Sequence, residues 1–196
     1  DHLVTLLHSG VVYPSERDPS QLFEALARLK ASGTIDASKL RVRFRACRHM
    51  ELLSAMVHEH GVDDLVELLP GLPYREALAE MLTSDALLIL QASNCNHQVP
   101  AKVYEYFRAR RPLLALTDPV GDTAQVIRNA GLNFIVPLND ADAIAESLPV
   151  FLRKLESGEC AVASDRAVAE SSRRRGSEKL ADVFASLTDS PKRKSA

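Results

Sequence analysis

Six short strand-like runs, most of them apolar and each followed by a segment with helical periodicity, restrict the fold of this sequence more than any other feature. The runs cover residues 3–7, 41–46, 65–69, 86–90, 112–116 and 133–136. Several are apolar throughout, which is typical of strands that helices cover on both faces. Strands that alternate with helices favour right-handed crossovers and a parallel sheet. We therefore predict an α/β fold, a doubly wound, Rossmann-like parallel sheet of about six strands with helices on both faces.

The expected helices carry their own start and stop signals. Before the first helix, Asp18 is a candidate N-cap, Pro19 suits the first helical position and Gln21 could close a capping box. Gly61 is expected to end the second helix. Pro149 is expected to kink or break the sixth, because proline removes a backbone donor from the helix interior.

The apolar density falls after Ser157 and Gly158. We expect residues 1–157 to form a nucleotide-sugar-binding Rossmann-like domain, residues 158–190 a C-terminal helical extension, and residues 191–196 a disordered tail. The chain opens directly into a strand-like run without an initial Met or a visible signal peptide. That start is expected to lie just before the first strand of a domain.

Composition and charge exclude several classes of protein. A net charge of −2 gives no basic footprint for nucleic acid. No apolar run approaches the roughly 20 residues of a membrane span. The three cysteines, Cys47, Cys95 and Cys160, are odd in number and widely spaced, which favours a reducing, cytoplasmic compartment over a disulfide framework. The His and Cys residues show no convincing metal-ligand spacing, so no metal site is expected.

Parallel sheets bind their ligands beyond the carboxyl ends of the strands. Three connections therefore matter most, and they cover residues 9–18, 91–99 and 117–123. In the first, Gly10 would allow a ligand close to the backbone, and Arg17 could hold phosphate oxygens near a helix N-terminus. Arg17 could equally be a solvated loop arginine. His8, which closes the first strand, is either structural or a substrate contact.

The second connection is long and polar, and such loops often carry function. In the helix after it, Glu105 lies away from the apolar stripe formed by Val99, Val103 and Phe107. It is either an exposed helix glutamate or a carboxylate that accepts two hydrogen bonds from the hydroxyls of a ribose.

Several segments resemble the donor-binding, C-terminal domain of GT-B fold, family 4-type retaining glycosyltransferases (glycosyl transferases group 1-like). Residues 98–107 and 111–116 resemble the donor-site segment of that family. Other matching segments follow in the expected order and spacing between residues 3 and 156; they are 9–13, 17–26, 61–73 and 84–88. The resemblance implies a nucleotide-sugar site at the carboxyl rim of the sheet.

The resemblance also assigns roles to single residues. Glu105 matches the second glutamate of the family's Glu-x7-Glu motif, which holds the ribose, and His97 stands where the first glutamate would be. Arg17 matches one member of the basic pair that binds the diphosphate. Val11 stands at the other, so that charge is missing or comes from elsewhere, with Arg45 and Arg48 as candidates. The remaining donor-binding residues that the resemblance implies are Gly10, Gly71, Leu72, Lys102, Gly121 and Asp122.

The function that we expect is transfer of a hexosyl-type sugar from a nucleotide-diphosphate sugar to an acceptor, in cell-surface polysaccharide or glycolipid synthesis. Arg17 and Glu105 would serve catalysis without a metal or other cofactor. A missing N-terminal domain would bind the acceptor, so this chain alone should be inactive. The full-length protein would be cytoplasmic and could associate peripherally with the inner face of a membrane. Two alternatives stay open: a nucleotide-sugar epimerase of similar build, and a non-enzymatic nucleotide-binding module, which Val11 and His97 favour.

Overall fold

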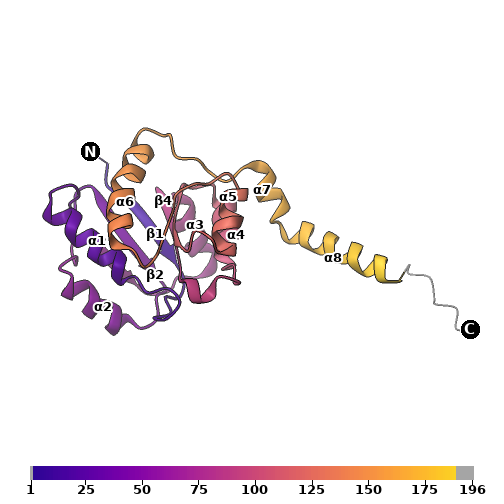
Figure 1. The fold of residues 1–196 in the computed structure, drawn as a ribbon, viewed down its shortest axis with the longest axis horizontal. Helices are drawn as coiled ribbons and strands as arrows, with labels where there is room; N and C mark the ends of the chain where they lie inside the picture. Colours follow the sequence, from indigo (N-terminus) through magenta and orange to yellow (C-terminus); the bar gives the residue numbers. More distant parts are fainter. Residues whose placement is uncertain (1, 189–196) are drawn as a thin grey trace, which may run out of the picture.

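The computed structural model describes residues 2–188, and the expected tail at 191–196 lies outside the described residues. Its centre is a six-stranded parallel sheet (Figure 1) in the order β3-β2-β1-β4-β5-β6. The strands are β1 (Val4–Ser9), β2 (Leu40–Arg45), β3 (Val66–Leu69), β4 (Ala86–Gln91), β5 (Leu113–Thr117) and β6 (Ile135–Val136). Each expected run overlaps one strand, so the predicted fold class is confirmed.

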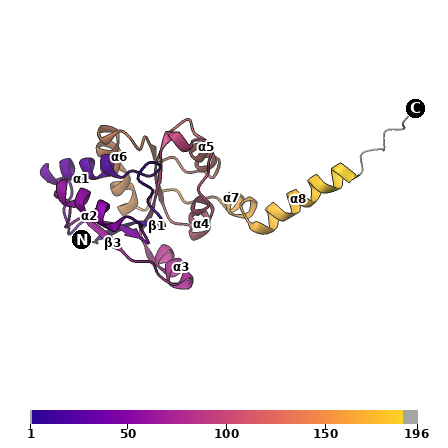
Figure 2. The same cartoon turned by 90° about the horizontal axis from the view of Figure 1, so that it is seen from below.

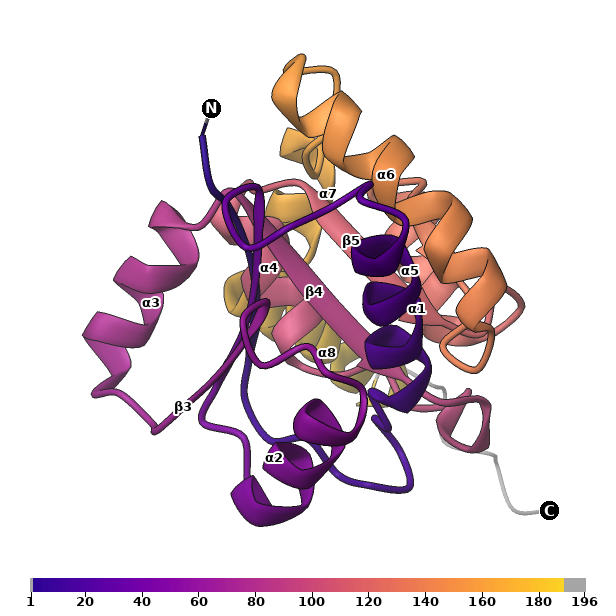
Figure 3. The same cartoon turned by 90° about the vertical axis from the view of Figure 1, so that its left-hand side faces the viewer.

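Helices cover both faces of the sheet. One face packs against α1 (Ser20–Ala31), α2 (Met50–Glu59) and α6 (Ala141–Glu156). The other packs against α3 (Tyr74–Thr83), α4 (Lys102–Ala109) and α5 (Asp122–Asn129). Figure 3 shows α1 and α6 side by side on one face and α4 on the opposite one. This two-sided cover explains the strand composition, because every residue of β4 and β5 is buried.

The start of α1 differs from the expectation. Ser20 is its first residue and Pro19 occupies the N-cap, where no side-chain capping bond forms among the described residues. The carboxylate of Asp18 instead accepts a hydrogen bond from the backbone N–H of Ser20 at 2.9 Å. Such a turn is a local alternative to a capping box, so the predicted box with Gln21 is wrong.

The expected break at Pro149 is also wrong, since α6 runs through it from Ala141 to Glu156. Asp140 caps this helix by accepting a hydrogen bond from the backbone N–H of Ala143 at 2.9 Å. Leu148 and Phe151, on either side of the proline, are fully buried in the core. Tertiary packing of that apolar face outweighs the local cost of the proline. The predicted stop of α2 is confirmed, because Gly61 follows it with a φ of 63°.

Two more helices, α7 (Asp165–Glu170) and α8 (Arg173–Thr188), follow the sheet. The basic run at 173–175 forms the first turn of α8. Figures 1 and 2 show α8 extending away from the body of the sheet. Within residues 2–188, no helix combines the length and the apolar character that a membrane crossing requires.

Candidate functional site at the carboxyl rim of the sheet

The three expected connections meet where β1, β4 and β5 end. A short 3-10 helix, η1 (Ser93–Cys95), lies in the β4–α4 connection. The backbone N–H of Ala92 donates to the carbonyl oxygen of Glu16 at 2.7 Å, which joins the β4 connection to the β1 connection. The backbone N–H of Asp122 donates to the carbonyl oxygen of Asn96 at 3.0 Å, which joins it to the β5 connection. The rim is therefore one continuous structure built from loops far apart in sequence.

Lys102, the first residue of α4, reaches back to the end of β1. Its Nζ donates to Nε2 of His8 at 3.0 Å. A Cβ added at Gly10 would lie only 2.9 Å from the same Nζ. Gly10 also has a φ of 122°, which L side chains rarely adopt. Both observations explain the glycine, because it leaves room for the lysine amine beside the strand end.

Burial at this position lowers the pKa values of Lys102 and His8. Burial, and next the charge of Arg17, lower the pKa of Lys102 to about 7, and the charge of Glu105 opposes this shift. Burial, and next the charge of Lys102, hold the pKa of His8 well below its usual value. His8 is therefore neutral at pH 7, and the lysine is the group of this pair that carries charge.

Arg17 lies in the same region and approaches from the β1–α1 connection. Its Nη1 donates to the carbonyl oxygen of Val11 at 2.8 Å, and its guanidinium lies over the ring of Tyr13 at 5.1 Å from the centroid. Its Nε is buried and has no hydrogen-bond partner among the described residues. Because its charge lowers the pKa of Lys102, the two cations are close enough to repel one another. The structure thus concentrates positive charge beside Gly10.

Glu105 lies on the exposed side of α4, one turn from Lys102. It forms no ion pair within residues 2–188, but its charge raises the pKa values of both Lys102 and Tyr106. Its carboxylate is therefore accessible and near the cations, as a ribose-binding group would have to be.

Gly121 and Asp122, the residues expected from the β5–α5 connection, contact residues of the β4–α4 connection. A Cβ at Gly121 would lie 2.6 Å from Oδ1 of Asn96, whose Nδ2 donates to Asp118 at 2.6 Å. His97, with an almost fully exposed side chain, has its Nδ1 4.0 Å from the carboxylate of Asp122. Gly121 and Asp122 therefore lie beside the β4–α4 connection. His97 points to solvent and contacts neither Arg17 nor Lys102.

Gly71 and Leu72 follow β3, which is the edge strand of the sheet on the side away from β5 and β6. A Cβ at Gly71 would make an ordinary contact of 3.7 Å with Ala46, at the end of β2. No interaction that joins these two residues to Arg17 or Lys102 is found among residues 2–188. Their predicted contact with a nucleotide base stays a prediction.

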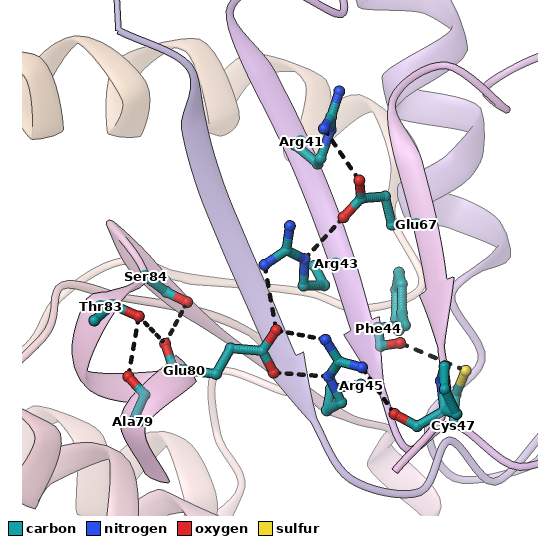
Figure 4. Close-up of polar contacts among 11 residues, drawn as sticks. Arg41, Arg43, Phe44, Arg45, Cys47, Glu67, Ala79, Glu80, Thr83 and Ser84 are labelled. Atoms are coloured by element: carbon teal, nitrogen blue, oxygen red, sulfur yellow. Dashed lines mark hydrogen bonds and ion pairs between the residues drawn. The ribbon is translucent and has the colours of Figure 1, made fainter. Parts of the chain in front are cut away.

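Arg45 is not free to replace the charge that Val11 lacks. Figure 4 shows a ladder of ion pairs on one face of β2 and β3, in which Glu80 of α3 holds Arg45 through two hydrogen bonds of 2.8 and 2.7 Å. Glu80 also pairs with Arg43, and Glu67 pairs with Arg41 and Arg43. Arg48 is exposed on the β2–α2 connection. Lys102, rather than Arg45, is the second cation beside Gly10.

Two cavities open at this rim. The larger, of about 580 Å³, lies between the connections that follow β1, β4, β5 and β6; its lining includes Ser15, Ser20, Ser93, Asp118 and Asn139. The smaller, of about 190 Å³, lies between the start of α1 and α2. Neither is lined by Arg17, Lys102 or Glu105. The cationic cluster therefore borders the rim outside both cavities.

Sequence reasoning did not identify Tyr106 or Asn96. Tyr106 is buried and its hydroxyl accepts a hydrogen bond from the backbone N–H of Ser9 at 2.8 Å. Its position three residues after Val103 is a helical-stripe signal that could have placed it on the buried face. Asn96 gives no comparable signal, because its contacts come from a loop 22 residues away. Among residues 2–188, no cluster of three or more His, Cys, Asp or Glu side chains could hold a metal ion.

Comparisons with known proteins support the fold. No protein-family model matches this sequence, and no curated protein matches it. Solved structures do match: a glycosyltransferase from Rickettsia africae has a TM-score of 0.70 at 15% identity, over 96% of this chain and 49% of that one. The pneumococcal O-GlcNAc transferase GtfA, in complex with UDP and GlcNAc, has a TM-score of 0.66 at 14% identity, over 95% of this chain and 36% of that one.

A third neighbour is the Anabaena protein HepE, in complex with UDP and glucose. It has a TM-score of 0.65 at 14% identity, over 95% of this chain and 48% of that one. The chain therefore spans half the length or less of these three structures. At such low identity the likeness shows a glycosyltransferase-like fold, and fold alone does not assign chemistry.

Proposed function

We propose that this chain is the donor-binding half of a glycosyltransferase of the family 4 type, which moves a sugar from a nucleotide-diphosphate sugar to an acceptor. The observation that carries the proposal is the convergence of Lys102 and Arg17 beside Gly10, at the carboxyl end of the central strand β1. Two of the structural neighbours were solved in complex with UDP, which supports a nucleotide as the ligand of this chain.

The two cations would act on the diphosphate. When the glycosidic bond to the donor breaks, the diphosphate leaves with increasing negative charge. Arg17 and Lys102 would stabilise that charge, together with the N-terminus of α1 at Ser20, without a metal ion. The buried, unpaired Nε of Arg17 is a donor that a phosphate oxygen could satisfy.

Glu105 would orient the nucleotide by accepting hydrogen bonds from the two ribose hydroxyls. Gly71 and Leu72 would lie near the base, and Gly121 and Asp122 would lie near the donor. His97 stands where the resembling family has the carboxylate that contacts the donor sugar, so the resemblance assigns neither the sugar nor the mode of transfer. Because His97 is so exposed and Val11 carries no charge, a nucleotide-binding module without catalysis is the second candidate.

The acceptor would bind a second domain, which is consistent with a chain that spans half or less of its structural neighbours. This chain by itself would bind nucleotide weakly and transfer no sugar. We place the full-length enzyme in the cytoplasm, in association with the inner membrane face, where hexosyl transfer would serve polysaccharide or glycolipid synthesis.

The test is a calorimetric titration of uridine and guanosine diphosphates into the wild-type chain and its Glu105→Ala variant. Losing hydrogen bonds to a charged acceptor should weaken binding by about 1.5–3 kcal/mol, or roughly 10- to 150-fold. Glu146→Ala removes another exposed helix glutamate, on α6, and should leave binding unchanged. If wild type binds neither nucleotide, the proposed function is wrong. Sugar transfer assayed with the full-length protein separates the transferase from the module.

A further inference from the structure

His8 is fully buried at the end of β1, yet both of its ring nitrogens have partners. Nδ1 lies 3.0 Å from the carbonyl oxygen of Leu88 on the neighbouring strand β4. Because a carbonyl can only accept, Nδ1 must carry the hydrogen. Nε2 of the neutral ring is then an acceptor, and it faces the Lys102 amine at 3.0 Å. The backbone of β4 thus sets the tautomer that receives the lysine.

The Lys102 amine is enclosed by groups from two elements. His8, Arg17 and the carbonyl oxygen of Val11 face this region from β1 and the connection after it. Glu105 and Tyr106 face it from α4. Tyr106 stays protonated because burial raises the pKa of its hydroxyl. The negative charge of Glu105 raises the pKa of the Lys102 amine, and the positive charge of Arg17 lowers it.

We propose that His8 is a positioning residue which holds the Lys102 amine beside Gly10, so that a bound diphosphate draws a proton onto Lys102. This inference rests on the proposed function, because the diphosphate is the ligand of that same site. His8 itself touches no ligand. It fixes the position of the Lys102 amine, and that position determines the charge of the lysine.

The direction of the coupling follows from electrostatics. Without ligand, burial and Arg17 lower the pKa of Lys102 to about 7, so the amine is largely neutral at pH 8. A diphosphate favours the charged amine and raises that pKa, so binding takes up a proton. Above pH 7 the affinity should then fall by about tenfold for each pH unit, until the pKa of the complex is reached.

The experiment is titration calorimetry of the chain with uridine and guanosine diphosphates at pH 8 and pH 9, in buffers with different ionisation enthalpies. At pH 8 the terminal phosphate of the ligand is already ionised and its base is neutral, so protons taken up at that pH come onto the protein. At pH 8 wild type should take up nearly one proton, and its affinity should fall about tenfold by pH 9. Lys102→Arg should take up none, and its affinity should not fall between pH 8 and pH 9, because arginine does not deprotonate in this range.

Two substitutions at His8 separate positioning from packing. The amide of His8→Asn reaches the place of Nδ1 and can still donate to Leu88, but it leaves Lys102 without an acceptor. The amide of His8→Gln reaches the place of Nε2. In the Asn variant, Lys102 can turn to solvent and recover an ordinary pKa. Its proton uptake at pH 8 should be lost and its affinity reduced about tenfold, whereas His8→Gln should restore both. His58→Asn, an exposed histidine on α2, is the matched control.

The possible results are distinct. Proton uptake in wild type that vanishes in Lys102→Arg and in His8→Asn would support the inference. Binding without proton uptake, or equal uptake in wild type and His8→Asn, would overturn it and leave the proposed function intact. If His8→Asn does not fold, the comparison of wild type with Lys102→Arg still decides whether the lysine is the proton acceptor. Absence of binding at either pH and at pH 6 would overturn the proposed function, and this inference with it.

Discussion

The hydroxyl of Tyr106 accepts a hydrogen bond from the backbone N–H of Ser9 at 2.8 Å and so ties α4 to the last residue of β1. Ser9 immediately precedes Gly10, and Tyr106 lies one helical turn after Lys102. This bond therefore sets the position of α4, with Lys102 and Glu105 on it, relative to the strand end.

Tyr106→Phe should lower both stability and nucleotide affinity. The change leaves the Ser9 N–H without its partner, which costs about 1–3 kcal/mol when the group is buried. Urea denaturation and titration with uridine diphosphate measure the two effects. Tyr104→Phe, on the exposed side of the same helix, should change neither by more than about 0.5 kcal/mol. Equal behaviour of the two variants would show that the bond contributes nothing.

Gly10→Ala should abolish most diphosphate binding. The new methyl group would lie 2.9 Å from the Lys102 amine, and the φ of 122° is strained for alanine. The backbone strain should cost about 1–3 kcal/mol of stability. Gly33→Ala provides the control, because Gly33 has a φ of 71° but no atom within 4 Å of its Cβ position. The control should lose stability and keep its affinity; loss of affinity in both variants would mean that strain, not the lysine contact, is responsible.

Gly121→Ala should displace the β4–α4 connection. Its Cβ would lie 2.6 Å from Oδ1 of Asn96, closer than real contacts allow, so the Asn96 side chain must leave its hydrogen bond with Asp118. A loss of about 1–2 kcal/mol is expected for that charge-assisted bond, measured by thermal or urea unfolding. Gly71→Ala, whose Cβ meets only an ordinary 3.7 Å contact, should be close to neutral for stability. A stable Gly121→Ala protein would show that Asn96 relaxes freely.

Glu80→Gln should destabilise the fold in a pH-dependent manner. The hydrogen bonds from Arg45, the largest effect, lower the pKa of Glu80, so the carboxylate contributes stability above its unfolded pKa of about 4.3 and loses it as the pH falls through the lower folded value. At pH 7 the variant should be about 1–3 kcal/mol less stable.

At pH 3 the difference between wild type and Glu80→Gln should shrink, and urea denaturation at both pH values measures it. Glu67→Gln changes a more exposed member of the same ladder and should have a smaller effect at pH 7. A difference that does not vary with pH would show that the charge of Glu80 is not what stabilises the ladder.

Much of the fold could be predicted because buried strands leave a local signal. β4 and β5 are apolar along nearly their whole length, so their places in the chain follow from the sequence itself. Helix starts were predicted less accurately. Pro19 lies at the N-cap and not at the first helical position, one position from the prediction. Several backbone N–H groups lie close to the Asp18 carboxylate, and the sequence does not show that Ser20 is the one that donates to it. The continuity of α6 through Pro149 depends on packing, which no local pattern contains.

The candidate site was harder to predict than the fold. Gly10, Arg17, Lys102 and Glu105 could be selected from the sequence, and the structure brings them to one region. The contact between Lys102 and His8 joins residues 94 positions apart, so only the sheet order reveals it. The alternation of arginines in β2 indicates a polar face, but Glu80 as the partner of Arg45 comes from α3 and from packing.

The order of the strands has a consequence for how the site can be taken apart. Arg17 belongs to the half of the sheet that contains β1, β2 and β3, and Lys102 belongs to the half that contains β4, β5 and β6. The two cations therefore lie on opposite sides of the boundary between β1 and β4. Cleavage of the chain between α3 and β4 would give two fragments, each with only one of the two cations. Nucleotide binding would then report the reassembly of the two fragments, since neither could gather the charge alone.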